Sequence, residues 1–222
     1  MFTGLIAETG TILAFEKKTG AARLRVATPT LATQLHTGDS IAVSGVCLTA
    51  LAITAQGFEA DLLEETLRRT SLADLAPGSS VNLELPTPAG TPLGGHVVQG
   101  HVDGVGRLTS LTPVTLGLES ETDWLLKLAA PATLARYIVE KGSISINGIS
   151  LTVAAVEPGE HGTANVTIAI IPHTYAVTNL HTLQPGDPIN LEVDVLAKYA
   201  EQRGRTHQPE TITELSLIAQ GY

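Results

Sequence analysis

Short runs in which apolar and polar residues alternate dominate this chain, and they predict β-strands. Residues 143–146, for example, read Ser-Ile-Ser-Ile, a pattern that places one face of a strand inward and the other outward. Such runs are rich in β-branched residues and are bounded by Gly, Pro, Asn or Asp. They predict strands at 23–27, 40–43, 48–53, 57–62 and 81–85, and again at 125–128, 143–146, 151–156, 165–170 and 189–193.

Helical spacing of apolar residues is limited to a few segments. It predicts helices at 64–70, 132–140 and 174–179, and stronger ones near the end of the chain at 193–202 and 213–219. The polar stretch at 204–209 predicts a loop between the last two. A terminal helix present once per chain could contact another copy of the chain or cover its own barrel, and the sequence supports both equally.

The order of motifs indicates one unit that occurs twice. Ser-Gly-Val-Cys-Leu-Thr at 44–49 recurs as Asn-Gly-Ile-Ser-Leu-Thr at 147–152. Gly4 followed by Gly10 recurs as Gly100 followed by Gly106, and Pro-Gly with a later Asn-Leu-Glu occurs at 77–84 and at 185–192. A period near half the chain length is typical of duplicated domains and not of a solenoid.

The strands and the repeat together predict the architecture. Five or six short strands within about a hundred residues are typical of a small Greek-key barrel, whose closure removes exposed sheet edges. We therefore expect a mainly β protein with two tandem barrels related by duplication, followed by a C-terminal helical segment. The predicted boundaries are 1–95 for the first barrel, 96–192 for the second and 193–222 for the terminal segment, which is a candidate for oligomerisation.

Composition excludes several classes of partner. The chain has 222 residues with a net charge of −9, and its 13 Lys and Arg residues are spread along its length. Nucleic acid and anionic membrane surfaces are bound by clustered positive charge, so we expect neither as a partner. The single cysteine, Cys47, excludes an internal disulfide framework and a Cys-rich zinc site. No segment resembles a signal peptide or a membrane span, so we expect a cytoplasmic location.

A glycine-rich segment at 94–106 joins the two halves. It lacks the Lys-Ser/Thr ending of a phosphate loop and leads into strand-like sequence. His96 and His101 are a poor metal pair because residues five apart on a strand point to opposite faces. The glycines indicate either bulges and bends in the barrel or a close approach of backbone to a flat ligand, and both explanations remain open.

The repeat singles out small polar residues that occur in both halves. Cys47 corresponds to Ser150, Thr49 to Thr152 and Thr66 to Thr174. A lone cysteine is usually inert packing, and a strand threonine is usually only a good β-former. Correspondence with a second polar residue favours a shared binding role. The other histidines, at 36, 161, 181 and 207, are interpreted as surface residues.

Several motifs together resemble riboflavin synthase of the alpha-subunit type, a family of duplicated lumazine-binding barrels. They are Met-Phe-Thr-Gly-Leu-Ile at 1–6, the pair at 45–49 and 148–152, the linker 94–106, Glu-Glu-Thr-Leu at 64–67 and Ile-Pro-His-Thr at 171–174. The resemblance spans residues 1 to about 199, and the joint order of the motifs is specific. It implies two six-stranded barrels, a C-terminal helix and a homotrimer with each active site between subunits.

The resemblance also implies the reaction and the site. Two molecules of 6,7-dimethyl-8-ribityllumazine bind at each active site, and one transfers a four-carbon unit to the other, without cofactor or metal. The products are riboflavin and 5-amino-6-(ribitylamino)uracil. The first pocket is expected from Gly4, Leu5, Ile6, Cys47, Leu48, Thr49, Asp61, Leu62, Leu63, Glu64, Glu65 and Thr66. The second is expected from Gly100, His101, Val102, Ser150, Leu151, Thr152, Ile171, Pro172, His173, Thr174, Tyr175 and Ala176, with Lys141 nearby.

Three of these residues are candidates for catalysis. His101 can transfer protons near neutral pH and is the preferred base for removal of the 7-methyl proton, although a structural role in hydrogen bonding is the alternative. Ser150 and Cys47 are candidates to supply or position the nucleophile that adds at ring carbon 7. Asn147 and its counterpart Ser44 cannot act as bases, so a mechanism that needs a carboxylate there is unsupported.

Two other functions compete with this interpretation. Lumazine proteins have the same duplicated barrels but carry a fluorescent ligand without turnover. Both halves here keep the Gly-x-x-Leu-Thr core together with His101 and Ser150, which favours catalysis. A barrel-type flavin oxidoreductase would need a basic phosphate-binding site, and the sequence offers none.

Overall fold

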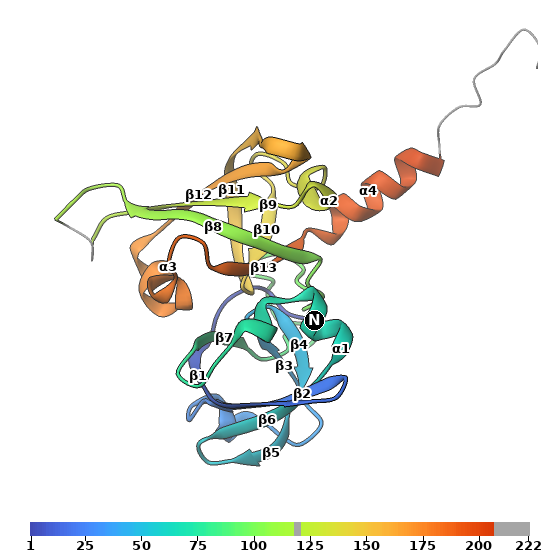
Figure 1. The fold of residues 1–222 in the computed structure, drawn as a ribbon, viewed down its shortest axis with the longest axis vertical. Helices are drawn as coiled ribbons and strands as arrows, with labels where there is room; N and C mark the ends of the chain where they lie inside the picture. The colour runs from blue at the N-terminus through green and yellow to red at the C-terminus, as the bar shows by residue number, and fades with distance from the viewer. Residues whose placement is uncertain (118–120, 207–222) are drawn as a thin grey trace, which may run out of the picture.

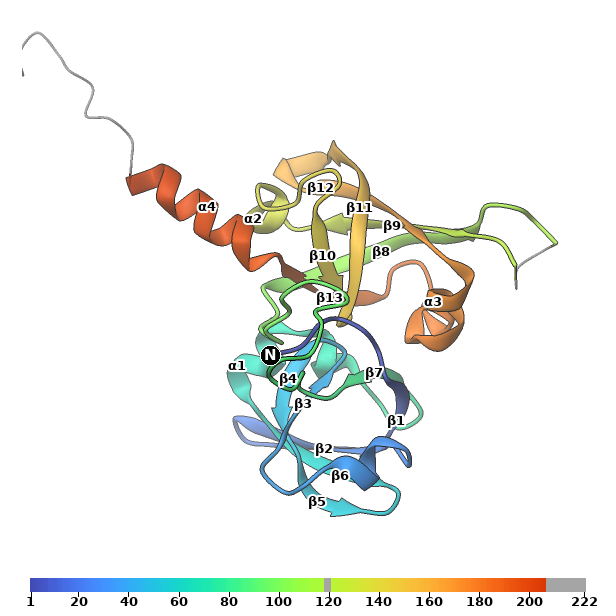
Figure 2. The ribbon, with the colours of Figure 1, turned by 180° about the vertical axis from the view of Figure 1, so that it is seen from behind.

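Two β-barrels lie one above the other along the long axis of the molecule (Figure 1). The computed structural model describes residues 1–117 and 121–206. The first barrel is built from the N-terminal half of the chain and the second from the C-terminal half, with the linker running between them (Figures 1 and 2). The predicted mainly β architecture with duplicated barrels is confirmed.

The first barrel consists of one sheet in the order β4-β3-β7-β1-β2-β6-β5. Its strands are β1 (Glu8–Lys18), β2 (Ala21–Ala27), β3 (Ser40–Val43), β4 (Val46–Thr49), β5 (Leu51–Thr54), β6 (Gly57–Leu63) and β7 (Ser80–Glu84). The neighbouring strands pair antiparallel.

The predicted strand at 48–53 is two strands in the structure, which gives this barrel seven instead of six. β4 pairs with β3 and β5 pairs with β6, while Ala50 alone separates β4 from β5. Ala52 has a φ of 43°, and the register against β6 shifts between Leu51 and Thr54. The partner strand changes from β3 to β6 at Ala50, and the left-handed Ala52 then bends β5 within its own ladder with β6. The β4–β5 chain thereby closes the ring.

The second barrel is closed in the order β10-β11-β12-β9-β8-β13 and has the expected six strands. They are β8 (Gly104–Pro113), β9 (Trp124–Ala130), β10 (Ser143–Ile146), β11 (Ile149–Pro158), β12 (Ala164–Ile170) and β13 (Pro188–Val193). Here β11 runs without a break along the path that β4 and β5 share in the first barrel. It contacts β10 at one end and β12 at the other.

Two long strands, β1 and β8, escaped prediction from the sequence. β1 carries several charged residues and β8 contains Gly106 and ends at Pro113, and both features weaken a strand pattern. Both strands also shift register against their neighbours, between Ile12 and Ala14 in β1 and between Leu108 and Ser110 in β8. Such an irregularity disrupts the alternation of apolar and polar residues on which the prediction depends.

The helices are short. They are η1 (Leu31–Gln34), α1 (Glu64–Arg69), η2 (Ser71–Asp74), α2 (Ala132–Ala135), η3 (Glu160–Gly162), α3 (Pro172–Val177), η4 (Asn179–Thr182) and α4 (Val195–Thr206). Helices η1, α1 and η2 of the first half correspond to α2, α3 and η4 of the second, whereas η3 and α4 have no counterpart. The predicted helix at 132–140 is wrong beyond Ala135, since the β-branched pair Ile138 and Val139 favours extended backbone. The predicted helix at 213–219 lies outside the described residues. No helix of the described part is long and apolar enough to span a membrane.

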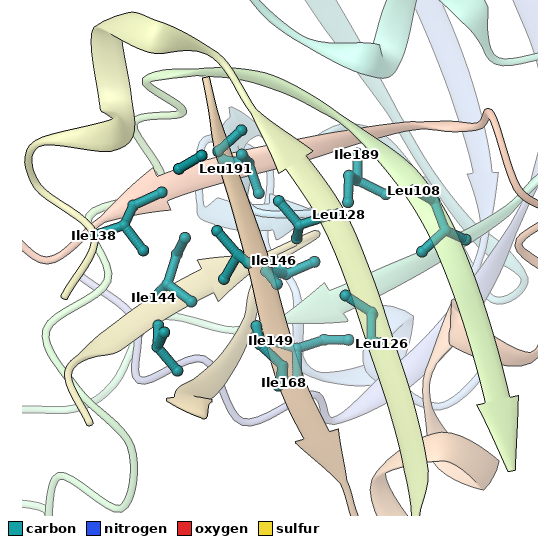
Figure 3. Close-up of a cluster of buried hydrophobic side chains, with 14 of the residues drawn as sticks. Leu108, Leu126, Leu128, Ile138, Ile144, Ile146, Ile149, Ile168, Ile189 and Leu191 are labelled. Atoms are coloured by element: carbon teal, nitrogen blue, oxygen red, sulfur yellow. The ribbon is translucent and has the colours of Figure 1, made fainter. Parts of the chain in front are cut away.

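Each barrel encloses its own apolar core. In the second barrel, inward-facing side chains of every strand meet, among them Leu108, Leu126, Ile144, Ile168 and Leu191 (Figure 3). The first barrel has a matching cluster around Leu24, Ile41, Phe58, Leu62 and Leu83. Truncating a buried side chain of this kind to Ala typically costs about 2–5 kcal/mol, so each core fixes the strand ends that carry the site.

A symmetric pair of asparagines joins the two barrels. Asn82 of β7 donates through Nδ2 to the carbonyl of Asn147 at 2.9 Å, and its counterpart Asn190 of β13 donates to the carbonyl of Ser44 at 2.9 Å. Asn82 Oδ1 accepts the N–H of Asn179, and Asn190 Oδ1 accepts the N–H of Ser71, both at 2.7 Å. Both asparagines are buried and use donors and acceptors across the interface, so the duplicated halves are held in a defined orientation.

Helix α4 contacts its own barrel at its base and then projects from the body of the molecule (Figures 1 and 2). Lys198 pairs with Asp103 at 2.6 Å, and Arg136 pairs with Glu201 at 3.1 Å. Leu196 and Tyr199 are nevertheless about two-thirds exposed. The helix is therefore anchored to the second barrel and keeps an apolar surface in solvent.

Candidate active site

The segments that precede β1 and β8 exchange partners between the barrels. The N–H of Ser150 in the second barrel donates to the carbonyl of Gly4 at 2.8 Å, and the N–H of Cys47 in the first donates to the carbonyl of Gly100 at 2.9 Å. Ile6 packs against the core of the second barrel, and Val102 packs against that of the first. Each candidate site is therefore built from both halves of the chain.

This exchange differs from the grouping that the family resemblance implied. The first-barrel site combines Cys47, Leu48 and Thr49 with the segment 100–102, and not with 4–6. The second-barrel site combines Ser150, Leu151 and Thr152 with the segment 4–6, and not with 100–102. The repeat indicated which residues correspond, but correspondence does not indicate which barrel a crossing segment contacts.

Two glycines make the exchange possible. Gly4 and Gly100 have φ values of 77° and 79°, a region that L side chains rarely adopt. A Cβ atom on Gly4 would lie 2.6 Å from Ser150 Cβ, and one on Gly100 would lie 2.6 Å from Cys47 Cβ. Both glycines thus allow two segments of the chain to pack closely against each other. For Gly100 this differs from the two explanations considered for segment 94–106, which were bends in the barrel and close approach to a ligand.

A buried glutamate holds each crossing segment. Glu84 accepts the N–H groups of Thr3 at 2.7 Å and of Gly4 at 2.9 Å. Glu192 accepts those of Gln99 at 2.7 Å and of Gly100 and His101 at 3.0 Å. Burial raises the pKa of both carboxyls, and the N–H donors oppose that rise. The two carboxylates fix the backbone of both sites.

In the first-barrel site the expected acidic side chains are engaged by arginines. Asp61 at the end of β6 receives a bidentate bond from Arg23, at 2.6 and 2.8 Å, and this lowers the pKa of Asp61. Glu65 in α1 pairs with Arg68 and with Arg69, which lowers the pKa of Glu65. Both carboxyls are held ionised, so they can accept hydrogen bonds but are poor bases.

The other residues of this site differ in exposure. Cys47 and Thr66 are half-buried, Leu48 and Leu62 are buried, and Leu63 is exposed by 71%. Thr49, Glu64 and His101 are exposed. The side chains that can contact a ligand therefore lie around a partly open rim, with Cys47 at its inner edge.

The second-barrel site is formed by β11, α3 and the segment 4–6. Ser150 and Leu151 are half-buried, Thr152 and Ile171 are exposed, and Tyr175 of α3 stacks on Trp124 with ring centroids 3.8 Å apart. Pro172 begins α3, where its fixed φ suits the first helical turn. Lys141 is exposed in a turn, and its N–H donates to the carbonyl of Val153 at 2.8 Å. His173, Thr174 and Ala176 complete α3.

Comparison with known proteins identifies the repeated unit. A family model described as the lumazine binding domain matches residues 3–86 and again 99–194. The riboflavin synthase of Mycobacterium tuberculosis (strain ATCC 25618 / H37Rv) is 44% identical over 207 residues, which cover 93% of this chain and 99% of that protein. The riboflavin synthase of Bacillus subtilis (strain 168) is 36% identical over 226 residues, covering both chains completely. The chain belongs to the riboflavin synthase family.

Solved structures support the fold of this riboflavin synthase family member. LumP complexed with 6,7-dimethyl-8-(1'-D-ribityl)lumazine has a TM-score of 0.75 at 23% identity and covers 87% of this chain and 99% of its own. LumP complexed with riboflavin has the same TM-score at 25% identity. Two barrels in this arrangement thus recur in a protein that binds such ligands.

One residue beside the candidate second-barrel site escaped prediction. His96 Nδ1 lies 2.7 Å from Ser150 Oγ, and its ring is buried. The sequence had drawn attention to His96 only as a weak metal ligand with His101, because the repeat gives it no counterpart. His101, the preferred base, lies instead with the segment that crosses to Cys47. The crossing of the chain could not be foreseen, so neither could this neighbour.

A cavity of about 370 Å³ lies between the barrels and is separate from both sites. It is lined by residues of the interface, including Ser44, Ser71, Asn147 and Asn179. Asn147 Oδ1 accepts the N–H of Asn190 at 2.8 Å, and Asn147 adopts a φ of 46° in its turn. Asn147 is also engaged at the interface, where its carbonyl accepts from Asn82 of the first barrel.

Proposed function

We propose that this protein is a riboflavin synthase that converts two molecules of 6,7-dimethyl-8-ribityllumazine into riboflavin and 5-amino-6-(ribitylamino)uracil by transfer of a four-carbon unit. The observation that carries the proposal is the pair of matched sites in one chain, each made from both halves. Relatives named riboflavin synthase, 36–44% identical over nearly the whole chain, support the same conclusion.

The geometry suits a flat ring with amide-like edges. Each site offers a strand edge, a small polar side chain and a threonine: Cys47 with Thr49 in one, Ser150 with Thr152 in the other. Backbone groups and hydroxyls can read the donors and acceptors of such a ring. Asp61 of β6, Glu65 and Thr66 of α1, and Thr174 of α3 are suited to the ribityl hydroxyls.

The largest catalytic contribution comes from holding two rings together. Effective molarities for well-oriented reactants reach about 10⁵ M or more, whereas a positioned base adds roughly 10²- to 10⁴-fold. In our proposal His101 removes the 7-methyl proton, and Ser150 and Cys47 position the nucleophile. These roles rest on the sequence and on the position of each residue at its site.

We further propose that the active enzyme is a homotrimer in which the first-barrel site of one subunit faces the second-barrel site of its neighbour. Apolar side chains at both sites support such a contact, since Leu63, Ile171 and Leu5 are all more than half exposed. The exposed Leu196 and Tyr199 of α4 support a contact between copies. A cytoplasmic location and the domain boundaries at 95 and 192 remain predictions from the sequence.

The test is incubation of the purified protein with 6,7-dimethyl-8-ribityllumazine alone. We expect riboflavin to form at half the rate of substrate loss, with two substrate molecules bound per chain. Sedimentation in the same buffer should give the mass of three chains. Stoichiometric binding without conversion would instead support the alternative of a non-catalytic carrier, which the similarity to LumP makes worth excluding.

A further inference from the structure

Ser150 and Cys47 occupy matched positions but contact different side chains. Ser150 Oγ lies 2.7 Å from His96 Nδ1, whereas Cys47 packs against the apolar cluster of Phe2, Ala42 and Val98. The backbone around both positions is equivalent, since each N–H donates to the carbonyl of a crossing glycine. The contrast therefore lies in the side chains alone.

The backbone of His96 is fixed by its neighbours, and burial of the ring favours its neutral form. The backbone N–H of His96 donates to the carbonyl of Thr3 at 3.2 Å. A Cβ on the preceding Gly95 would lie 2.1 Å from that same carbonyl oxygen, so only glycine fits there. Burial lowers the pKa of His96, while the charge of Asp194 raises it by less. A neutral imidazole has one N–H donor and one acceptor nitrogen.

The remaining ring nitrogen determines which tautomer is favoured. His96 Nε2 is buried and has no hydrogen-bond partner among the described residues. A buried N–H without an acceptor is rarer in proteins than an unpaired acceptor. The proton therefore belongs on Nδ1, which donates to Ser150 Oγ and leaves the lone pair on Nε2. The Ser150 hydroxyl hydrogen is then free to point away from the histidine.

We propose that His96 is a positioning residue that turns the Ser150 hydroxyl into a fixed hydrogen-bond donor toward an acceptor atom of the ring bound in the second-barrel site. The inference rests on the proposed function and deepens it. In the first-barrel site, the thiol of Cys47 is only a weak donor and has an apolar neighbourhood. The second-barrel site thus offers the bound ring a hydroxyl donor, whereas the first-barrel site offers only a weakly donating thiol at the matched position.

This difference has a chemical consequence. Loss of the 7-methyl proton and addition of a nucleophile at carbon 7 both place negative charge on the ring. A preorganised donor at the ring edge stabilises that charge more than it stabilises the neutral ground state. In our proposal, the ring bound at Ser150 is therefore the one whose negative charge is stabilised by a hydrogen bond to its edge. Its partner at Cys47 has no corresponding hydroxyl donor at this position, since Cys47 packs against apolar side chains.

The test compares turnover with binding in matched variants. His96→Asn keeps an amide N–H near the place of Nδ1, whereas His96→Gln moves it toward the place of Nε2. We expect His96→Gln and Ser150→Ala each to lower kcat by roughly tenfold to a hundredfold. His96→Asn should keep kcat within about threefold of the wild type, because one hydrogen bond is retained. The control, His36→Asn, replaces an exposed histidine and should leave kcat unchanged.

Binding to the second-barrel site can be followed separately through Trp124, the single tryptophan, which stacks on Tyr175 in that site. Quenching of its fluorescence by the substrate should give similar affinities in all four variants, within about threefold. The double variant His96→Gln with Ser150→Ala should be no slower than Ser150→Ala alone. Additive losses in the double variant, or equal losses in His96→Asn and His96→Gln, would overturn the proposal.

A spectroscopic measurement separates this inference from the proposed function. In protein with ¹⁵N-labelled histidine, the His96 ring should show the proton on Nδ1, and Ser150→Ala should perturb that signal. A proton on Nε2 would contradict the proposal even if the enzyme is active. A wild-type protein that forms no riboflavin but shows the expected tautomer would refute the function and leave the hydrogen-bond assignment intact.

Discussion

The two barrels share the parts that position a ligand and differ in the parts that act on it. Glu84 and Glu192 hold equivalent crossing segments, and Asn82 and Asn190 make equivalent bonds across the interface. At the positions that contact the ligand in our proposal, the threonines are shared, whereas Cys47 in one barrel corresponds to Ser150 in the other. A reaction between two identical molecules needs matched pockets for binding and unmatched chemistry for turnover.

The differences extend beyond Ser150 and Cys47. In α3 of the second barrel, Tyr175 stacks on Trp124, whereas the corresponding position of α1 is Leu67. The first-barrel site has two carboxylates engaged by arginines, and the corresponding positions of the second barrel are Ala169 and His173. Duplication thus explains the shared scaffold, and divergence of a few side chains makes the sites unequal.

The largest effect is expected from adding a side chain to Gly4 or Gly100, where the crossing segments approach the opposite barrel most closely. Gly4→Ala and Gly100→Ala each combine a left-handed backbone with a Cβ 2.6 Å from the partner strand. We expect each to lower the free energy of unfolding by about 3 kcal/mol, measured by urea denaturation. Gly4→Ala should impair binding at Ser150 and Gly100→Ala binding at Cys47, because each glycine serves the opposite barrel.

Gly38→Ala is the matched control for these two variants. Gly38 has a φ of 99°, but nothing lies within 4 Å of the position of its Cβ. Only the backbone strain remains, about 1–2 kcal/mol. If Gly4→Ala or Gly100→Ala costs no more than Gly38→Ala, the close approach of the crossing segments contributes nothing to stability.

The next largest effect on stability is expected from substitution of Glu84 and Glu192, the two buried glutamates that hold the crossing segments. Glu84→Gln and Glu192→Gln each replace one acceptor oxygen by an NH₂ group that faces backbone donors. We expect each to lower the free energy of unfolding by about 2 kcal/mol, because at least one buried N–H loses its acceptor. Urea denaturation of the two variants side by side tests whether the barrels respond alike. A change in the free energy of unfolding below about 0.5 kcal/mol in either variant would show that the carboxylate it removes does not stabilise the fold.

Exchange of the two polar residues sharpens the contrast between the sites. Ser150→Cys replaces a strong hydroxyl partner of His96 by a thiol and should lower kcat by about tenfold. Cys47→Ser places a hydroxyl beside apolar side chains without a histidine and should change kcat by less than about threefold. Steady-state kinetics with both variants provides the measurement. Equal losses would mean that the histidine confers no difference between the sites.

Much of the fold could be predicted because period-2 patterns report burial directly. The strands at 40–43, 57–62, 143–146 and 165–170 were predicted within a residue of their observed ends. Strands β1 and β8 were missed because each spans a register shift, and because charged residues in β1 and Gly106 and Pro113 in β8 weaken the strand pattern. The repeat, in contrast, depends on glycines and turns, and it predicted the duplication correctly.

The site could be predicted only as sets of residues. The correspondence of Cys47 with Ser150 followed from the repeat, but the exchange of segments 4–6 and 100–102 did not, because sequence order carries no information on which barrel a linker contacts. The contact of His96 with Ser150 was not predicted for the same reason, since it depends on the path of the linker between the barrels. Features that break the repeat could be found only in the structure.

The smallest expected effect concerns the difference between the pKa values of Glu84 and Glu192. Burial raises the pKa of Glu84 and of Glu192, but the ammonium of Lys198 lowers that of Glu192 alone. Lys198→Met should therefore raise the pKa of Glu192 and leave that of Glu84 unchanged, as measured by NMR titration of the carboxyl carbons. Because folding raises these pKa values above 4.5, the stability contributed by each carboxyl is fully present below about pH 4.5 and is lost as the pH rises through the folded-state pKa. The variant should then lose more stability than the wild type between pH 4.5 and neutrality, and an equal shift at Glu84 would show that the two glutamates are not electrostatically distinct.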